Sequence, residues 1–415
     1  MITKQVHYGW IMVILSMIAM AAHSMVMFTP GIFLKPVTTG FGWERGALSA
    51  AQSITMFVGG ILGILTGRLC DKYGPRRLTT ANGILAGMSF LLMSQISSLW
   101  QVYLIWGLLM GIAYSCGIVP ISSTIPRWFT KRRGIAVGLT QAGFGLGGVI
   151  WPPLAQWLIS DYGWRWAYAT LGLITIVIVI PLAQFLKHSP QRIGLKPYGE
   201  DEITEEQSRN SVVKELSFQQ IIKSGRFWAF GLIGLGFMFW LQIILVHIAP
   251  YAIDIGVLAI VAASIVSIIA GVSIFGRLTI GFISDKIGPR LTLTACLVTF
   301  TLAMILLLFS EQTWMLFIFA VIFGIAYGAE IPVLTLVPAE LFGVKYLGVI
   351  AGVTMFLGTI GGAIGVPLAG RIFDATESYS LAFLICVIIG VLTIILSLIL
   401  LRSKSIEDIL LAQGR

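Results

Sequence analysis

Apolar residues occur in twelve long runs along the chain, and short polar segments separate most of these runs. A helix that crosses a membrane needs about 20 predominantly apolar residues, and each run meets or approaches that length. The runs cover residues 9–33, 47–69, 78–96, 100–125, 134–160, 166–186, 227–252, 258–284, 291–309, 314–337, 347–370 and 380–401. The pattern predicts an all-α membrane protein with twelve transmembrane helices.

A longer polar stretch, residues 187–226, separates the sixth run from the seventh, and it is rich in acidic residues between Glu200 and Glu206. We therefore predict an N-terminal six-helix bundle at 1–186, a cytoplasmic linker at 187–226, a C-terminal six-helix bundle at 227–401 and a tail at 402–415. Within the linker, residues 215–225 fit either an amphipathic surface helix or a solvated loop.

The two predicted bundles share short sequence motifs at a nearly constant spacing. The run GRLCDKYGPR at 67–76 is repeated as GFISDKIGPR at 281–290, and GIAY at 111–114 recurs at 324–327. The glycine pair 147–148 likewise recurs at 361–362. These matches predict two pseudo-symmetric halves, and parallel repeats of this kind imply that one half rocks against the other around a site near the middle of the membrane.

Composition supports a lipid environment, and the distribution of basic residues predicts an orientation. Hydrophobic residues make up 57% of the chain and charged residues only 11%, against about 25% charged in soluble domains. With a cytoplasmic N-terminus, only four of the 27 Lys and Arg residues would lie in outside loops, namely Lys35, Arg45, Arg165 and Arg371. Lys and Arg accumulate in cytoplasmic loops. We therefore predict that both termini are cytoplasmic, and that the net charge of +9 reflects this topology and not a nucleic-acid partner.

The sequence shows no pattern typical of an enzyme or a metalloprotein. The cysteines lie far apart and form neither a CxxC motif nor a Cys/His cluster; they are Cys70, Cys116, Cys296 and Cys386. We find no nucleotide-binding loop and no nucleophile elbow, so we expect no enzymatic activity, cofactor or metal. The first apolar run is too long for the core of a cleavable signal peptide.

Two signatures resemble known transporter families. The run GRLCDKYGPRR at 67–77, together with its copy at 281–290, resembles the signature loop of the major facilitator superfamily and covers both halves. The run WFTKRRGIAVGLTQAGFGLGG at 128–148 resembles the signature of the monocarboxylate transporters, as does the opening Tyr8-Gly9-Trp10. Bacterial oxalate/formate exchangers are close cousins. The resemblance implies the major facilitator fold and transport of a carboxylate.

The signature loops contain the residues expected to form a cytoplasmic gate, namely Arg68, Asp71 and Asp285. Asp71 either caps a helix end or pairs with an arginine of a neighbouring helix; the alternative is a turn that only sets topology. The basic cluster 131–133 is expected to anchor at lipid headgroups.

Two ionisable residues lie deep within predicted helices. Arg277 lies eight residues before Asp285, and Glu330 lies eight residues before Pro338. Eight residues correspond to about 12 Å along a helix axis. A charge at the bilayer centre costs about 2.5–3.5 kcal/mol on insertion scales, so such residues face a cavity or a partner. We predict that they face each other, that Arg277 binds an anion and that Glu330 carries a proton. The alternative is a structural salt bridge.

The resemblance to monocarboxylate transporters supports part of this assignment. It implies a substrate-binding arginine on the eighth helix, and Arg277 stands in the matching context. The family's acidic residue one turn earlier is replaced by Ser273, and its helix-1 lysine by Phe28. Glu330 and His247 are left as candidate proton carriers.

Further side chains are predicted to line the substrate site. Tyr114 and Tyr327 occupy equivalent positions in the two halves, and their hydroxyls suit a carboxylate; ordinary packing is the alternative. We also assign substrate contacts to His247, Ser273, Phe28 and Phe356. For His247 and for His23 the alternative is a hydrogen bond to a backbone carbonyl.

A single buried guanidinium favours a substrate with one carboxylate, because it binds one carboxylate through two parallel hydrogen bonds. A dicarboxylate would require a second buried cation, and residues 347–370 contain no Lys or Arg. We predict proton-coupled symport of a lactate-like or pyruvate-like anion by a monomer. The alternatives are an exchanger of the oxalate/formate type and a membrane receptor that binds a carboxylate without transporting it.

Overall fold

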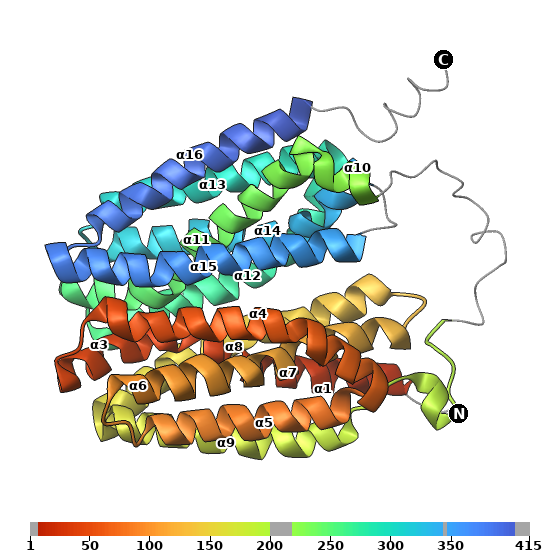
Figure 1. The fold of residues 1–415 in the computed structure, drawn as a ribbon, viewed down its shortest axis with the longest axis horizontal. Helices are drawn as coiled ribbons and strands as arrows, with labels where there is room; N and C mark the ends of the chain where they lie inside the picture. The colour runs from red at the N-terminus through yellow and green to blue at the C-terminus, as the bar shows by residue number, and fades with distance from the viewer. Residues whose placement is uncertain (1–6, 200–217, 343–346, 403–415) are drawn as a thin grey trace. The chain divides into compact units, whose positions relative to one another are not determined.

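The computed structural model describes residues 7–199, 218–342 and 347–402, and these residues are helical almost throughout (Figure 1). Within these described residues, eleven helices are long and apolar enough to cross a membrane. The one remaining predicted span, residues 78–96, corresponds to helix α5, Pro75–Met93, which is 19 residues long. It is less apolar because Arg76, Arg77 and Asn82 lie within it. The prediction of an all-α, multi-pass membrane protein is confirmed.

The chain divides into two compact units. Unit 1 comprises Met1–Trp43 and Ala47–Asn210, and unit 2 comprises Glu44–Gly46 and Ser211–Arg415. The acidic part of the predicted linker and the tail after Arg402 lie outside the described residues. The predicted surface helix at 215–225 is described only in part, as α10, Phe218–Lys223.

In unit 1 the described segments begin and end within a few residues of the predicted runs. They are α1 Tyr8–His23, α2 Met25–Phe28, α3 Pro30–Phe41, α4 Arg45–Tyr73, α5, α6 Leu99–Val102, η1 Tyr103–Leu109, α7 Met110–Thr124, η2 Ile125–Trp128, α8 Arg133–Tyr162, α9 Trp164–Phe185 and η3 Pro190–Ile193. The first span is longer than expected and is interrupted at Ser24 and again at Thr29; directly after Thr29, Pro30 lacks a backbone donor.

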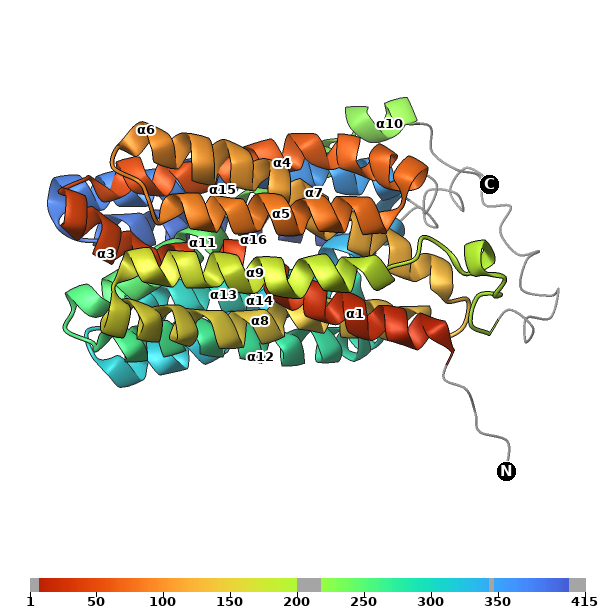
Figure 2. The ribbon, with the colours of Figure 1, turned by 90° about the horizontal axis from the view of Figure 1, so that it is seen from below.

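The described part of unit 2 contains six long helices after the short α10. They are α11 Gly225–Asp254, α12 Ala259–Ile287, α13 Pro289–Leu308, α14 Thr313–Phe342, α15 Leu347–Thr376 and α16 Ser380–Arg402. Helices α11 and α15 lie side by side, as do α12 and α14, and α13 packs on α16 (Figure 1). In unit 1, α5 lies beside α9 and α1 beside α8 (Figure 2).

Glycines at the helix contacts show that the repeat extends to packing. Gly147 of α8 lies directly against the carbonyl of Ala21 in α1, and Gly361 of α15 lies in the same way against the carbonyl of Leu235 in α11. Both residues of the second contact are 214 positions after those of the first. A side chain at either glycine would overlap main-chain atoms, so glycine is what allows the backbones to approach this closely.

Candidate functional site

Arg277 and Tyr327 meet inside unit 2. The guanidinium carbon of Arg277, on α12, lies 5.4 Å from the centroid of the Tyr327 ring on α14. The two helices approach closely because Gly328 of α14 lies against the Ser273 carbonyl and Gly276 of α12 lies against the Ile325 carbonyl. This contact brings a cation over an aromatic face, about 15 Å from the C-terminal end of α12.

The predicted pair of Arg277 with Glu330 is wrong. Glu330 is 0% exposed, and within the described chain neither of its carboxylate oxygens has a hydrogen-bond partner. Its carboxyl group lies near the buried Cys296 of α13. Tyr327 and Glu330 lie on adjacent but different faces of α14, so Tyr327 meets α12 while Glu330 turns toward α13. Arg277 and Glu330 lie at similar depths along their helices, but their side chains do not point toward each other. The structural salt bridge proposed as the alternative is excluded by the same observation.

His247 is held by two neighbours in unit 2. Its Nε2 atom lies 2.9 Å from the Val366 carbonyl, and its Nδ1 atom lies 3.1 Å from the Tyr379 hydroxyl. A carbonyl only accepts, so Nε2 donates, and Nδ1 of the neutral ring accepts from the tyrosine. Both nitrogens are therefore engaged. This arrangement matches the hydrogen bond to a backbone carbonyl that we considered as the alternative role of His247.

Ser273 and the two phenylalanines occupy different environments. Ser273 is fully buried, and its hydroxyl donates to the Ala270 carbonyl of its own helix at 2.7 Å. Phe28 is also fully buried and packs on Phe144 within unit 1, with ring centroids 5.5 Å apart. Phe356 of α15 is 45% exposed. Of these three, only Phe356 presents its side chain at the surface of a unit.

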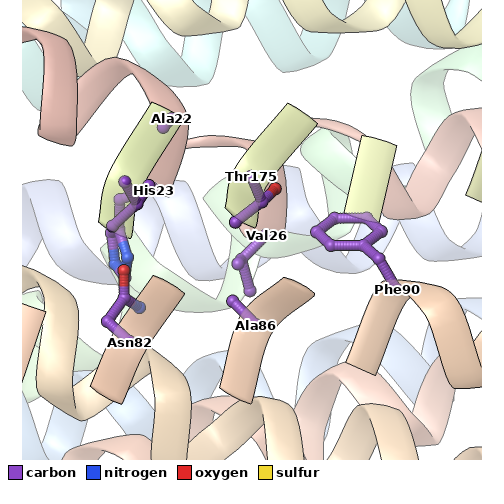
Figure 3. A pocket seen from close by; sticks show the side chains of 8 residues that line it. Ala22, His23, Val26, Asn82, Ala86, Phe90 and Thr175 are labelled. Carbon is purple, nitrogen blue, oxygen red and sulfur yellow. The ribbon is translucent and has the colours of Figure 1, made fainter. Parts of the chain in front are cut away.

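In unit 1, Tyr114 packs on a histidine. Its ring lies 4.9 Å from that of His23 on α1, centroid to centroid, and the two planes are inclined by 32°. His23 lines a narrow cavity between α1, α5 and α9, next to Asn82 (Figure 3). The expected hydrogen bond from His23 to a backbone carbonyl is absent, since neither ring nitrogen has a partner in the described chain. The nearby Ala113 carbonyl is already bound by Asn82, whose Nδ2 lies 2.8 Å away.

The first signature loop contains an ion pair. Asp71, near the end of α4, accepts a hydrogen bond of 2.5 Å from Arg127 of η2. This geometry matches the pairing that we expected of Asp71. The side chains are 34% and 65% exposed for Arg127 and Asp71, and pairs this exposed contribute about 0–1 kcal/mol. Arg68 of α4 is exposed and forms no ion pair in the described residues.

The second signature loop is built differently. Asp285 is exposed and forms no ion pair in the described part of unit 2, whereas Arg290 binds Glu340 at 2.6 Å. The repeat explains the difference, because Glu340 occupies the position that corresponds to Arg127 in unit 1. The position that holds a basic residue, Arg127, in the half of Asp71 therefore holds an acidic residue, Glu340, in the half of Asp285.

Arg127 and its second partner, His188, were not found from the sequence. Nη1 of Arg127 lies 2.8 Å from Nε2 of His188, which follows α9. These residues are 61 positions apart, so no local pattern connects them. Among the described residues, no group of three or more His, Cys, Asp or Glu side chains is placed to hold a metal ion.

Comparison with known proteins gives consistent matches along most of the chain. The sequence pattern of the Major Facilitator Superfamily matches residues 12–293 and 262–411. Monocarboxylate transporter 13 of Rattus norvegicus is 27% identical over 382 residues, which cover 91% of this chain and 85% of that protein. The uncharacterised MFS-type transporter YcxA of Bacillus subtilis is 25% identical over 390 residues, covering 90% of each chain.

Solved structures resemble the whole fold at low sequence identity. A bacterial homologue of the human lysosomal transporter Spinster, in an inward-facing and occupied conformation, aligns with a TM-score of 0.75 and 15% identity. The alignment covers 97% of this chain and 98% of that one. The nucleoside transporter NupG aligns with a TM-score of 0.72, also at 15% identity. At this identity the likeness is one of fold.

Proposed function

Because the chain belongs to the Major Facilitator Superfamily, we propose that it carries small monocarboxylate anions, of the lactate or pyruvate type, across the membrane by alternating access. The contact between Arg277 and Tyr327 is the observation that carries this proposal. The guanidinium lies within a membrane-spanning helix and is partly exposed, while the tyrosine ring beneath it is buried. Such a guanidinium binds one carboxylate through two hydrogen bonds.

Two further observations favour a substrate with a single carboxylate. Residues 347–370 of α15 contain no Lys or Arg, so this part of the helix offers no second cation; Arg371 lies in its last two turns. Several relatives at 25–28% identity carry the name monocarboxylate transporter. Phe356 on the same helix is accessible and suits contact with a short alkyl chain.

We further propose that transport is coupled to a proton and that Glu330 carries it. A carboxylate buried without a hydrogen-bond partner is far costlier than the neutral acid. Glu330 is therefore accommodated here as the protonated form, and it ionises when transport exposes it to water. His247 is less suited, because a proton on Nδ1 would displace the hydrogen bond from Tyr379.

Uptake by purified protein in proteoliposomes tests the proposal. Radiolabelled lactate or pyruvate should accumulate when the outside is more acidic, and unlabelled monocarboxylates should compete better than oxalate. Counterflow without any gradient separates a transporter from a receptor that only binds. If oxalate is taken up in strict exchange for formate while lactate is ignored, the exchanger interpretation replaces this one.

A further inference from the structure

Three segments of unit 1 are tied together by one arginine. Nη2 of Arg127 donates to Asp71 at the end of α4, and Nη1 of Arg127 contacts Nε2 of His188 at 2.8 Å. Arg127 itself lies in η2, directly after α7. The end of α4, the segment η2 after α7 and the segment after α9 therefore all meet at one guanidinium, beside further hydrogen bonds such as that from Trp128 Nε1 to the Lys187 carbonyl at 3.3 Å.

The contact with Arg127 determines the protonation state of His188. A guanidinium only donates hydrogen bonds, so Nε2 of His188 must accept, and the ring must be the neutral tautomer with its proton on Nδ1. Nδ1 is buried and has no partner in the described residues. A second proton would occupy Nε2, remove the acceptor and place a cation against Arg127.

The charges around His188 come from three elements. Arg127 of η2 and Arg192 of η3 are positive, and Asp71 of α4 is negative. The backbone of Gly74, which has a φ of +82°, packs against the Cβ of His188. Burial lowers the pKa of His188, the two arginines lower it further, and Asp71 raises it in part. His188 lies after the last residue of α9, outside the spanning segment.

We propose that His188 is a pH-sensitive latch on the first signature loop: the neutral ring holds Arg127 in its pair with Asp71, and the protonated ring releases it. Free histidine titrates near pH 6.5, so the latch is closed above that pH and opens as the pH falls below it. If this end of unit 1 faces the cytoplasm, the latch responds to acidification by the very protons that the proposed symport brings in. Only this consequence rests on the proposed function.

Nuclear magnetic resonance tests the latch directly, because the chain has only four histidines. Protein labelled at histidine carbons is titrated, and single His→Gln variants assign the signals. The titration midpoint of His188 should lie below about 6.5 and should rise in Arg127→Gln. An unchanged midpoint in Arg127→Gln would overturn the proposal.

Thermal melting provides a second measurement that needs no substrate. Between pH 7.5 and 5.5 the wild type should lose about 2 °C more than His188→Gln, whose amide oxygen accepts from Arg127 at every pH. His7→Gln is the matched control, because His7 is also in unit 1 and contacts a backbone carbonyl, that of Lys196 at 3.0 Å. It should keep the wild-type pH dependence. Equal pH dependence in wild type and His188→Gln would contradict the latch, and failure of lactate uptake would leave both measurements valid.

Discussion

At the scale of single residues, the polar groups of the membrane region differ in how they are satisfied. Both ring nitrogens of His247 form hydrogen bonds, whereas neither carboxylate oxygen of Glu330 has a hydrogen-bond partner in the described chain. The guanidinium of Arg277 lies over a tyrosine ring. A group whose bonds are complete stabilises one structure, whereas an unsatisfied buried group costs about 1–3 kcal/mol or more when charged. Glu330 is therefore the residue whose replacement separates function from stability most clearly.

Replacing Arg277 by lysine should cripple uptake without preventing folding. An ammonium keeps the charge but cannot present two parallel donors to a carboxylate. We expect the apparent affinity for lactate to fall at least about tenfold, equivalent to about 1.4 kcal/mol. Initial uptake rates over a concentration series measure this loss, and Arg402→Lys, at the exposed end of α16, is the control. Wild-type affinity in Arg277→Lys would remove the guanidinium from the substrate site.

Glu330→Gln should leave the protein as stable as the wild type. The amide is neutral, like the protonated acid, and no ion pair is lost, because Glu330 has none within the described chain. Counterflow should persist while proton-driven accumulation fails. Melting temperature and both transport assays are measured on one preparation.

Glu340→Gln is the control for that experiment, because it removes the partner of Arg290. It should lower the melting temperature and leave proton coupling intact. Intact accumulation in Glu330→Gln would show that the proton is carried elsewhere.

At the scale of helices, the sequence predicted where each helix lies in the chain and how deep its residues lie in the membrane. It did not predict the direction in which a side chain points around the helix. Long apolar runs identify spans because lipid offers the backbone no other partners, and all twelve are helical in the described residues. The depth of Glu330 was also readable. Its direction was not, since that depends on how α14 is rotated against α12 and α13.

Contacts between segments distant in sequence were equally hidden. Arg127 joins Asp71 and His188 across 56 and 61 positions, and only the folded unit brings these three together. The repeat held more information than we used, because it places Glu340 opposite Asp285 and so predicts that the two signature loops differ.

The contact between α12 and α14 supports a prediction at this scale. Gly328→Ala would push the new methyl group into the Ser273 carbonyl and force the helices apart. Overpacking of this kind costs about 1–3 kcal/mol. We expect a lower melting temperature together with weaker lactate affinity, because Arg277 and Tyr327 separate.

Gly281→Ala, also in α12, is the control, since a methyl group there meets nothing within 4 Å. It should preserve both properties. Unchanged affinity in Gly328→Ala would show that the spacing of the two helices does not set the substrate site.

At the scale of the whole molecule, the proposed coupling of one proton to one monoanion makes transport electroneutral. Lactate accumulation should follow a pH gradient and should not respond to a membrane potential of either sign. Proteoliposomes with a clamped potential and equal pH on both sides measure this. Concentrative uptake under those conditions would indicate another driving ion. That both termini face the cytoplasm stays a prediction.

The glycine contacts have a consequence for how damage to this protein can be repaired. Gly361 meets the main-chain carbonyl of Leu235, whereas Gly231 meets the side chain of Leu357. Every amino acid supplies the same carbonyl, so no exchange at position 235 makes room for a larger residue at 361. Exchange at position 357 does make room at 231. Gly231→Ala should therefore lower the melting temperature less than Gly361→Ala, and Leu357→Ala should remove what loss there is at position 231, while no exchange at position 235 should restore Gly361→Ala.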